Sequence, residues 1–230
     1  MTTKDPAMLG GTNYARVPLD FYPTPPRATE ALISIIEGDL EGYQFWEPFA
    51  GNGAIYNIIA PFCRQAASSD IAAYEGFDAD AMIDFFNVYT DEEDEACKLA
   101  LESFTPAWQM KDLEALFGFR PDLIISNPPY GDGASDTERS VRHALKLMEA
   151  EKGMVIFLMR HEWDTARGRS DLLDHPAFSA KITLRFRPVW IEKKPGEKTA
   201  SPRFSYAWYV WDFSKALTAP GAKAQMFYAG

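Results

Sequence analysis

Short apolar runs alternate along the chain with segments in which apolar residues recur at helical spacing. Such runs predict buried strands at 66–71, 121–127 and 153–159. The segment 43–62 begins as a short aromatic strand, passes through a glycine turn and continues as an apolar helix. Helical spacing also marks 28–38, behind prolines, and the residues after Ser135. Strands that alternate with helices predict a parallel α/β sheet.

The C-terminal third departs from that alternation. Two late strands, at 182–190 and 203–211, are joined by a polar turn and predict a hairpin, so we expect a mixed sheet whose last strand is antiparallel. Residues 88–119 fit the alternation poorly and predict an acidic helical insertion between the third and fourth strands. The insertion is either a lid or partner surface, or a solvated excursion.

We expect an irregular arm at 1–20, a main domain at 21–215 and a C-terminal tail at 216–230. The composition, 47% hydrophobic and 14% aromatic over 230 residues, fits one folded soluble domain. Without a long apolar stretch or a signal-peptide pattern, we expect a cytoplasmic protein. Two cysteines and three scattered histidines show no zinc spacing, so we expect no metal.

The net charge of −10 argues against a general nucleic-acid coat, but its distribution changes the picture. Residues 69–116 carry 13 acidic and 2 basic groups, whereas residues 140–230 carry 15 basic and 9 acidic groups. A polyanion can therefore meet the C-terminal part locally. The alternative is a solvated surface whose charges happen to segregate.

A glycine turn, Glu47 to Gly53, lies between the first strand and its helix, where open parallel sheets place their ligands. A dinucleotide fingerprint needs a further glycine at position 56, which is Tyr56, so a pyrophosphate site is disfavoured. Asp70 ends the next strand, where a carboxylate can accept hydrogen bonds from both hydroxyls of a ribose. The two features together favour a nucleoside without phosphates.

Asp84 and Phe85 follow a third apolar stretch. This pair can bind an exocyclic amine and stack on a purine. It can equally be a helix-capping aspartate beside a core phenylalanine, just as Asp70 can be an ordinary surface residue.

The sharpest motif is Asn127-Pro128-Pro129-Tyr130, directly after the buried strand. Two prolines stiffen the turn, so the Asn127 side chain and the Pro128 carbonyl become fixed acceptors for an amino group. Tyr130 offers a stacking face for an aromatic ring. The alternative is a rigid turn without enzymatic meaning.

With these motifs in this order, residues 20–212 resemble class I S-adenosylmethionine-dependent methyltransferases, in particular small phage-type relatives of the DNA N6-adenine enzymes. The Pro-rich segment 21–26 belongs to the same pattern. The resemblance implies a Rossmann-like α/β fold with a seven-stranded sheet. It also implies a methionine end lined by Tyr22, Thr24, Glu47, Phe49, Gly51 and Gly53, a ribose on Asp70, an adenine on Asp84 and Phe85, and an acceptor held by Asn127 to Tyr130, with Asn127 also beside the cofactor.

The resemblance implies methyl transfer to an exocyclic amine, with adenine N6 in DNA as the leading acceptor. Asn at position 127, where many DNA enzymes have Asp, keeps RNA bases and protein glutamine open as acceptors. We expect no separate target-recognition domain after the last strand, and we therefore expect loops to recognise the acceptor. From another class, the chain can be a catalytically idle fold whose acidic insertion captures a host factor.

Basic side chains follow two of the late strands, which should end on the same rim as Asn127. We expect nucleic-acid contacts, with stacking on the tryptophan, from Arg160, Trp163, Arg167, Arg169, Lys193, Lys194, Lys198 and Arg203. The alternative is that the arginines pair with Glu162, Asp164 and Asp171, and that the lysines are merely solvated.

Overall fold

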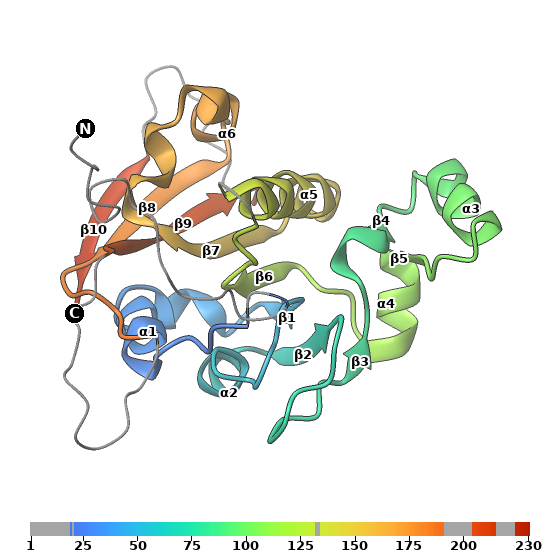
Figure 1. The fold of residues 1–230 in the computed structure, drawn as a ribbon, viewed down its shortest axis with the longest axis horizontal. Helices are drawn as coiled ribbons and strands as arrows, with labels where there is room; N and C mark the ends of the chain where they lie inside the picture. The colour runs from blue at the N-terminus through green and yellow to red at the C-terminus, as the bar shows by residue number, and fades with distance from the viewer. Residues whose placement is uncertain (1–18, 20, 132–133, 191–203, 215–223) are drawn as a thin grey trace, which may run out of the picture.

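The computed structural model describes residues 19, 21–131, 134–190, 204–214 and 224–230. They form an eight-stranded sheet in the order β10-β8-β9-β7-β6-β1-β2-β3 (Figure 1). Its strands are β1 (Gln44–Glu47), β2 (Gln65–Asp70), β3 (Ala81–Met82), β6 (Leu123–Ser126), β7 (Met154–Arg160), β8 (Phe178–Leu184), β9 (Tyr206–Asp212) and β10 (Gln225–Ala229). A separate parallel pair joins β4 (Val88–Tyr89) to β5 (Trp108–Gln109).

The directions of the strands confirm the expected mixed sheet. Seven of its strands run the same way, and β9 lies antiparallel between β7 and β8. The sheet has one strand more than the seven expected, because β10 pairs in parallel with the outer edge of β8. This strand lies within 216–230, the expected C-terminal tail. Of the seven strands that were expected, the last one, β9, is antiparallel, as predicted. The eighth strand, β10, is the last in the chain and runs parallel to β8.

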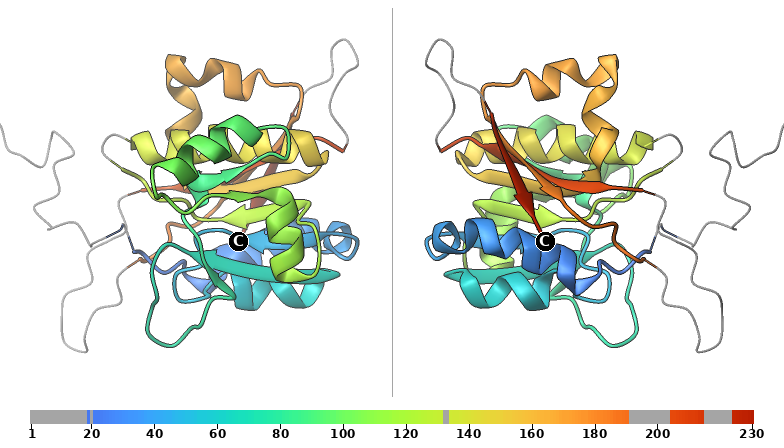
Figure 2. Two further views of the ribbon diagram at one scale, coloured as in Figure 1. Left: turned by 90° about the vertical axis from the view of Figure 1, so that its right-hand side faces the viewer. Right: turned by 90° about the vertical axis from the view of Figure 1, so that its left-hand side faces the viewer.

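Helices cover both faces of the sheet (Figure 2). They are α1 (Pro26–Leu40), α2 (Tyr56–Ile59), α3 (Asp94–Glu102), α4 (Met110–Phe117), α5 (Ser135–Glu151) and α6 (Ser170–Leu173). Helix α1 begins at a proline. Proline suits the first helical position because an N–H at that position would have no partner within the helix. It continues two residues beyond Gly38, to Leu40.

The central strands divide their side chains between two cores. Phe45, Ile125 and Ile156 pack with α1 and α2, whereas Trp46 and Ile124 pack with α4 and α5 on the opposite face. Successive side chains of a strand point to opposite faces, so a strand covered on both sides must be apolar throughout. This is why the apolar runs identified the strands correctly.

The insertion at 88–119 is helical, as expected, and carries β4, α3, β5 and α4 between β3 and β6. It projects from the end of the molecule that carries β3 (Figure 1). Its helix α4 is anchored in the core by Met110 and Leu113, which are fully buried. Phe104, by contrast, is 96% exposed. None of the helices described in the structure is long and apolar enough to cross a membrane.

Candidate active site

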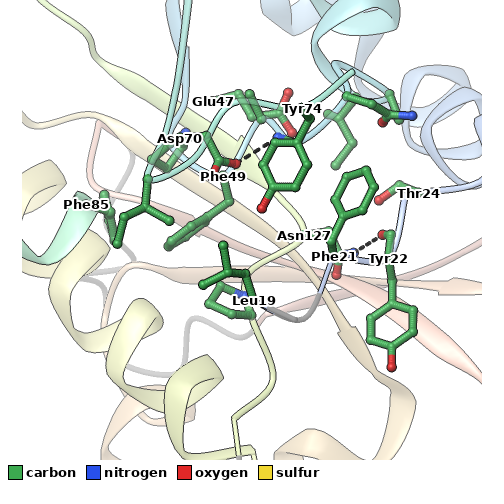
Figure 3. Close-up of a pocket in the computed structure, with 18 of the residues that line it drawn as sticks. Leu19, Phe21, Tyr22, Thr24, Glu47, Phe49, Asp70, Tyr74, Phe85 and Asn127 are labelled. Atoms are coloured by element: carbon green, nitrogen blue, oxygen red, sulfur yellow. Dashed lines mark hydrogen bonds between the residues drawn. The ribbon is translucent and has the colours of Figure 1, made fainter. Parts of the chain in front are cut away.

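A cavity of about 620 Å³ opens at the carboxyl ends of β1, β2 and β6, bounded by the short helix η4 (Phe85–Asn87) and the start of α5 (Figure 3). Parallel strands end together at one edge, which is why distant motifs of the sequence meet here. The predicted residues that line it are Tyr22, Thr24, Glu47, Phe49, Gly51, Asp70, Asp84, Phe85, Asn127 and Pro129. Gly53, Pro128 and Tyr130 are not among the residues that line it.

The glycine turn has a backbone that other residues rarely adopt. Gly51 and Gly53 have φ angles of 54° and 75°. A Cβ atom on Gly53 would lie 2.4 Å from the ring of Phe77, and one on Gly51 would lie 3.0 Å from Phe21. The turn therefore needs glycine at both positions, for conformation and for space.

Asp70 links this turn to the end of β2. Its Oδ2 accepts a hydrogen bond from the Gly51 N–H at 2.8 Å, and its Oδ1 accepts one from Ala72 at 3.2 Å. Burial raises the pKa of the Asp70 carboxyl, while these backbone hydrogen bonds oppose the rise. Each carboxylate oxygen has a further lone pair, so the group can still accept hydrogen bonds from a diol in the cavity.

Glu47 is the most deeply buried acid of the site, with 1% of its surface exposed. Its Oε1 lies 3.4 Å from the Ser126 hydroxyl, whereas its Oε2 is buried without a hydrogen-bond partner among the described residues. Burial raises the pKa of Glu47 well above its ordinary value; a hydrogen bond from the Tyr56 backbone opposes the rise, and the nearby charge of Asp70 adds to it. A buried carboxyl with an unsatisfied oxygen beside a cavity suits a cationic ligand group.

Asp84 and Phe85 have the capping and core roles considered for them, and both also line the cavity. Asp84 Oδ1 accepts a hydrogen bond from the Phe86 N–H at 3.0 Å and so caps η4. Phe85 is 2% exposed and packs edge-on against Phe49, at 4.9 Å between ring centroids. Both residues nevertheless border the cavity. The pair thus forms one wall of the pocket and part of the core behind it.

Two contacts hold the side chain of Asn127, which lies in the turn after β6. The Asn127 Nδ2 lies 3.5 Å from the Tyr22 carbonyl oxygen, and the Tyr130 hydroxyl lies 3.4 Å from Asn127 Oδ1. Thr137, on α5, donates to the Pro129 carbonyl oxygen at 3.0 Å and ties the turn to that helix. In this structure Tyr130 contacts Asn127 and the α1-side core, and its ring is not part of the cavity wall.

Sequence reasoning missed an aromatic pair at the mouth. Phe21 stacks on Tyr74, with 4.2 Å between ring centroids, and both line the cavity. Tyr22, next to Phe21, contributes its carbonyl oxygen to the contact with Asn127, while its ring points away from Phe21 (Figure 3). Arg139 and Phe86 also line the cavity, with the Arg139 guanidinium 3.8 Å from the ring centre. Phe21 belongs to a motif that sequence analysis noted, but nothing in the sequence marked Tyr74.

The expected nucleic-acid residues are only partly in place. Arg160 ends β7 and is exposed, as is Arg167. Trp163 is 3% exposed and packs against Tyr209 and Trp211, so the expectation that it stacks on bases is corrected: its ring belongs to the core. Its burial follows from the short helix after β7, which turns this side chain inward.

Arg169 lies 3.2 Å from Glu138 and covers the ring of Trp163, so this arginine supports the fold. Glu138 is not one of the three acids with which the arginines were expected to pair. Four basic residues of the expected surface lie outside the described residues: Lys193, Lys194, Lys198 and Arg203. The described part of the chain holds no cluster of three or more side chains that could bind a metal ion.

Solved structures share this architecture. A protein assigned as an RNA methyltransferase from Pyrococcus horikoshii aligns with a TM-score of 0.51 and 16% identity, over 88% of this chain and 92% of its own. A chain of the DrdV–DNA complex aligns with a TM-score of 0.51 and 12% identity, and the match covers 91% of this chain but 28% of that one. A modification subunit assigned to a type I restriction enzyme of Vibrio vulnificus aligns with a TM-score of 0.46 and 13% identity, over 90% of this chain and 49% of its own.

No protein-family model matches the sequence, and no curated protein matches it significantly. At these levels of identity the likeness shows the fold. The chain has the Rossmann-like α/β fold of class I methyltransferases, as the sequence predicted.

Proposed function

We propose that the protein transfers a methyl group from S-adenosylmethionine to an exocyclic amine, with adenine N6 in DNA as the first acceptor. One observation carries the proposal: a single cavity brings the unsatisfied carboxyl of Glu47, the carboxyl of Asp70 and the amide of Asn127 together at the strand ends. A solved structure with this fold is assigned as an RNA methyltransferase, which supports methyl transfer. Residues 21–215 would form the catalytic domain.

The side chains around the cavity match the parts of this cofactor. Glu47 would face the cationic groups of S-adenosylmethionine, because an ionised carboxylate with a free oxygen needs a positive partner. Asp70 would hold the ribose hydroxyls. Phe49 and Phe85, with Asp84 beside them, would border the adenine.

The acceptor would be held by the turn after β6. Asn127 Oδ1 and the Pro128 carbonyl are hydrogen-bond acceptors, so they would orient an amine and turn its lone pair out of conjugation with the ring. When bound, S-adenosylmethionine supplies the methyl carbon. The amine held by Asn127 and the Pro128 carbonyl would take this methyl group, with S-adenosylhomocysteine as the leaving group and water taking the proton of the amine. Tyr130 and the Tyr22 carbonyl keep Asn127 in place.

The experiment compares acceptors directly. The protein is incubated with S-adenosylmethionine labelled in its methyl group and with DNA, RNA or a protein extract, and we expect the label in DNA adenine. Label in RNA or in protein glutamine would move the assignment to those classes. Absence of cofactor binding by calorimetry would favour the idle fold that captures a partner.

Asp84→Ala tests the adenine wall. We expect S-adenosylmethionine affinity to fall by about 5- to 150-fold, the equivalent of losing a hydrogen bond worth roughly 1–3 kcal/mol. Because Asp84 also caps η4, thermal unfolding should show a loss of about 1 kcal/mol. Asp84→Asn preserves a cap and controls for that loss. Unchanged cofactor affinity in Asp84→Ala would remove this residue from the site.

A further inference from the structure

Three exposed arginines each lie over an aromatic ring. The Arg160 guanidinium lies 4.0 Å from the ring centre of Phe204, and that of Arg27 lies 4.1 Å from Phe186. The Arg185 guanidinium lies 5.1 Å from the ring centre of Tyr228, which is itself 56% exposed. We call these three pairs the arginine row.

The topology places the arginine row on the same rim as Asn127. Strands β6, β7, β8 and β10 run in one direction, so their carboxyl ends share an edge of the sheet (Figure 1). Arg160 ends β7, Arg185 follows β8, and Tyr228 is the penultimate residue of β10. Arg27 is in the first turn of α1, which contacts β8 and β10. From β6 to β10 the rim spans four strand spacings, or about 19 Å.

The arginine row differs from the arginines that support the fold. Arg120 lies 2.6 Å from Glu151, and Arg142 and Arg169 also pair with carboxylates. Within the described ranges, by contrast, no carboxylate lies at ion-pair distance from the three arginines of the row. Their positive charge is therefore available to an anionic ligand.

A guanidinium held on a ring is arranged to bind a nucleotide. Contact with the ring restricts the side chain, so less side-chain entropy is lost on binding, and N–H donors that the protein does not use can bind phosphate oxygens. The outer face of the guanidinium can stack on an unpaired base. A lysine has no planar face on which a base could stack. The bases of a duplex are already stacked on one another, so they could not reach the guanidinium face.

We propose that the arginine row binds a single-stranded or splayed stretch of nucleic acid and leads it to Asn127. This inference rests on the proposed function and names the form of its substrate. At a rise of about 3.4 Å for each stacked nucleotide, the rim would hold roughly five nucleotides. The row replaces Trp163 as the source of stacking.

The test measures anisotropy of a fluorescein-labelled single-stranded DNA of about 12 nucleotides across a salt series. The triple variant Arg27→Gln, Arg160→Gln, Arg185→Gln should bind roughly 100-fold more weakly at 0.1 M salt, with a log–log salt slope lower by about 2 units, since each contact to a single strand contributes about 0.7. A matched control removes three charges elsewhere: Arg64→Gln, Lys98→Gln, Lys111→Gln. It should retain the parental slope.

Replacing the same three arginines by lysine separates stacking from charge. This variant should keep the parental salt slope yet bind about 10-fold more weakly, because ammonium groups cannot stack. A glutamine triple variant with the parental affinity and slope would overturn the proposal, as would an equal loss in the control. Equal binding of a polyglutamate peptide by the parent would also overturn it, because the row would then be a general anion surface.

Calorimetry with S-adenosylmethionine on the same samples distinguishes the two proposals. Parental cofactor affinity in the glutamine triple variant, together with lost DNA binding, supports the arginine row. Cofactor binding by the parent without binding of the single strand removes the row and leaves methyl transfer standing. Strand binding without cofactor binding supports the row as a nucleic-acid site and removes the proposed reaction.

Discussion

Replacing Asn127 by alanine should lower methyl transfer by at least about 100-fold while S-adenosylmethionine affinity stays within a few-fold. The reason is that the Asn127 amide would bind the acceptor amine, and its hydrogen bonds strengthen as the nitrogen becomes positive in the transition state. The variant loses no buried core volume, because Asn127 lines the cavity. Single-turnover rates with labelled cofactor and calorimetry measure the two effects separately.

Two further substitutions test the same role of Asn127. Asn127→Asp retains an acceptor oxygen but places a carboxylate beside the Tyr22 carbonyl oxygen, so we expect partial activity. Tyr130→Phe removes the hydroxyl that lies 3.4 Å from Asn127 Oδ1, and we expect a loss of about 10-fold or less. Turnover of Asn127→Ala close to that of the parent would refute the reading of this motif.

The central sheet could be predicted because its strands are buried on both faces. Ile124 and Ile125 face different cores, and this requirement leaves a continuous apolar run in the sequence. Strands β4 and β5 left no such trace, because they have two residues each. Strand β10 was missed because Met226 and Tyr228 are exposed, so its sequence does not distinguish an edge strand from a tail.

The candidate site was predictable where it depends on strand ends and not where it depends on loops. Glu47, Asp70 and Asn127 follow strands whose ends must meet. The stacking of Phe21 on Tyr74 joins two irregular segments that no local pattern relates. Trp163 was misread because a tryptophan among arginines gives the same sequence whether its ring faces solvent or the core.

Glu47→Gln should stabilise the protein without cofactor at pH 8. Burial raises the pKa of Glu47 well above its ordinary value, so the folded protein holds this proton more tightly than the unfolded chain does. The stability contributed by the protonated form is complete below the ordinary pKa and is lost as the pH rises through the raised one. Because glutamine does not ionise, it avoids that loss, and we expect a gain of about 1–3 kcal/mol in the free energy of unfolding at pH 8. At pH 4 the difference should nearly vanish.

The same substitution should weaken the cofactor. An ionised Glu47 would meet its cationic groups, so Glu47→Gln is expected to cost about 10- to 150-fold in affinity, the value of a hydrogen bond to a charged group. In the parent, affinity should rise with pH and binding should release a proton. Burial also raises the pKa of Asp70, so the cofactor affinity of Glu47→Gln should still depend on pH, but less than that of the parent.

Urea unfolding at both pH values, and calorimetry in two buffers of different ionisation enthalpy, measure these effects. Glu37→Gln, on the exposed face of α1, is the matched control and should change neither quantity. Glu47→Gln should therefore be more stable than the parent and bind the cofactor more weakly, as expected where an ionisable group is kept in the core for a ligand. Cofactor affinity in Glu47→Gln equal to that of the parent would show that the buried carboxyl serves some other purpose.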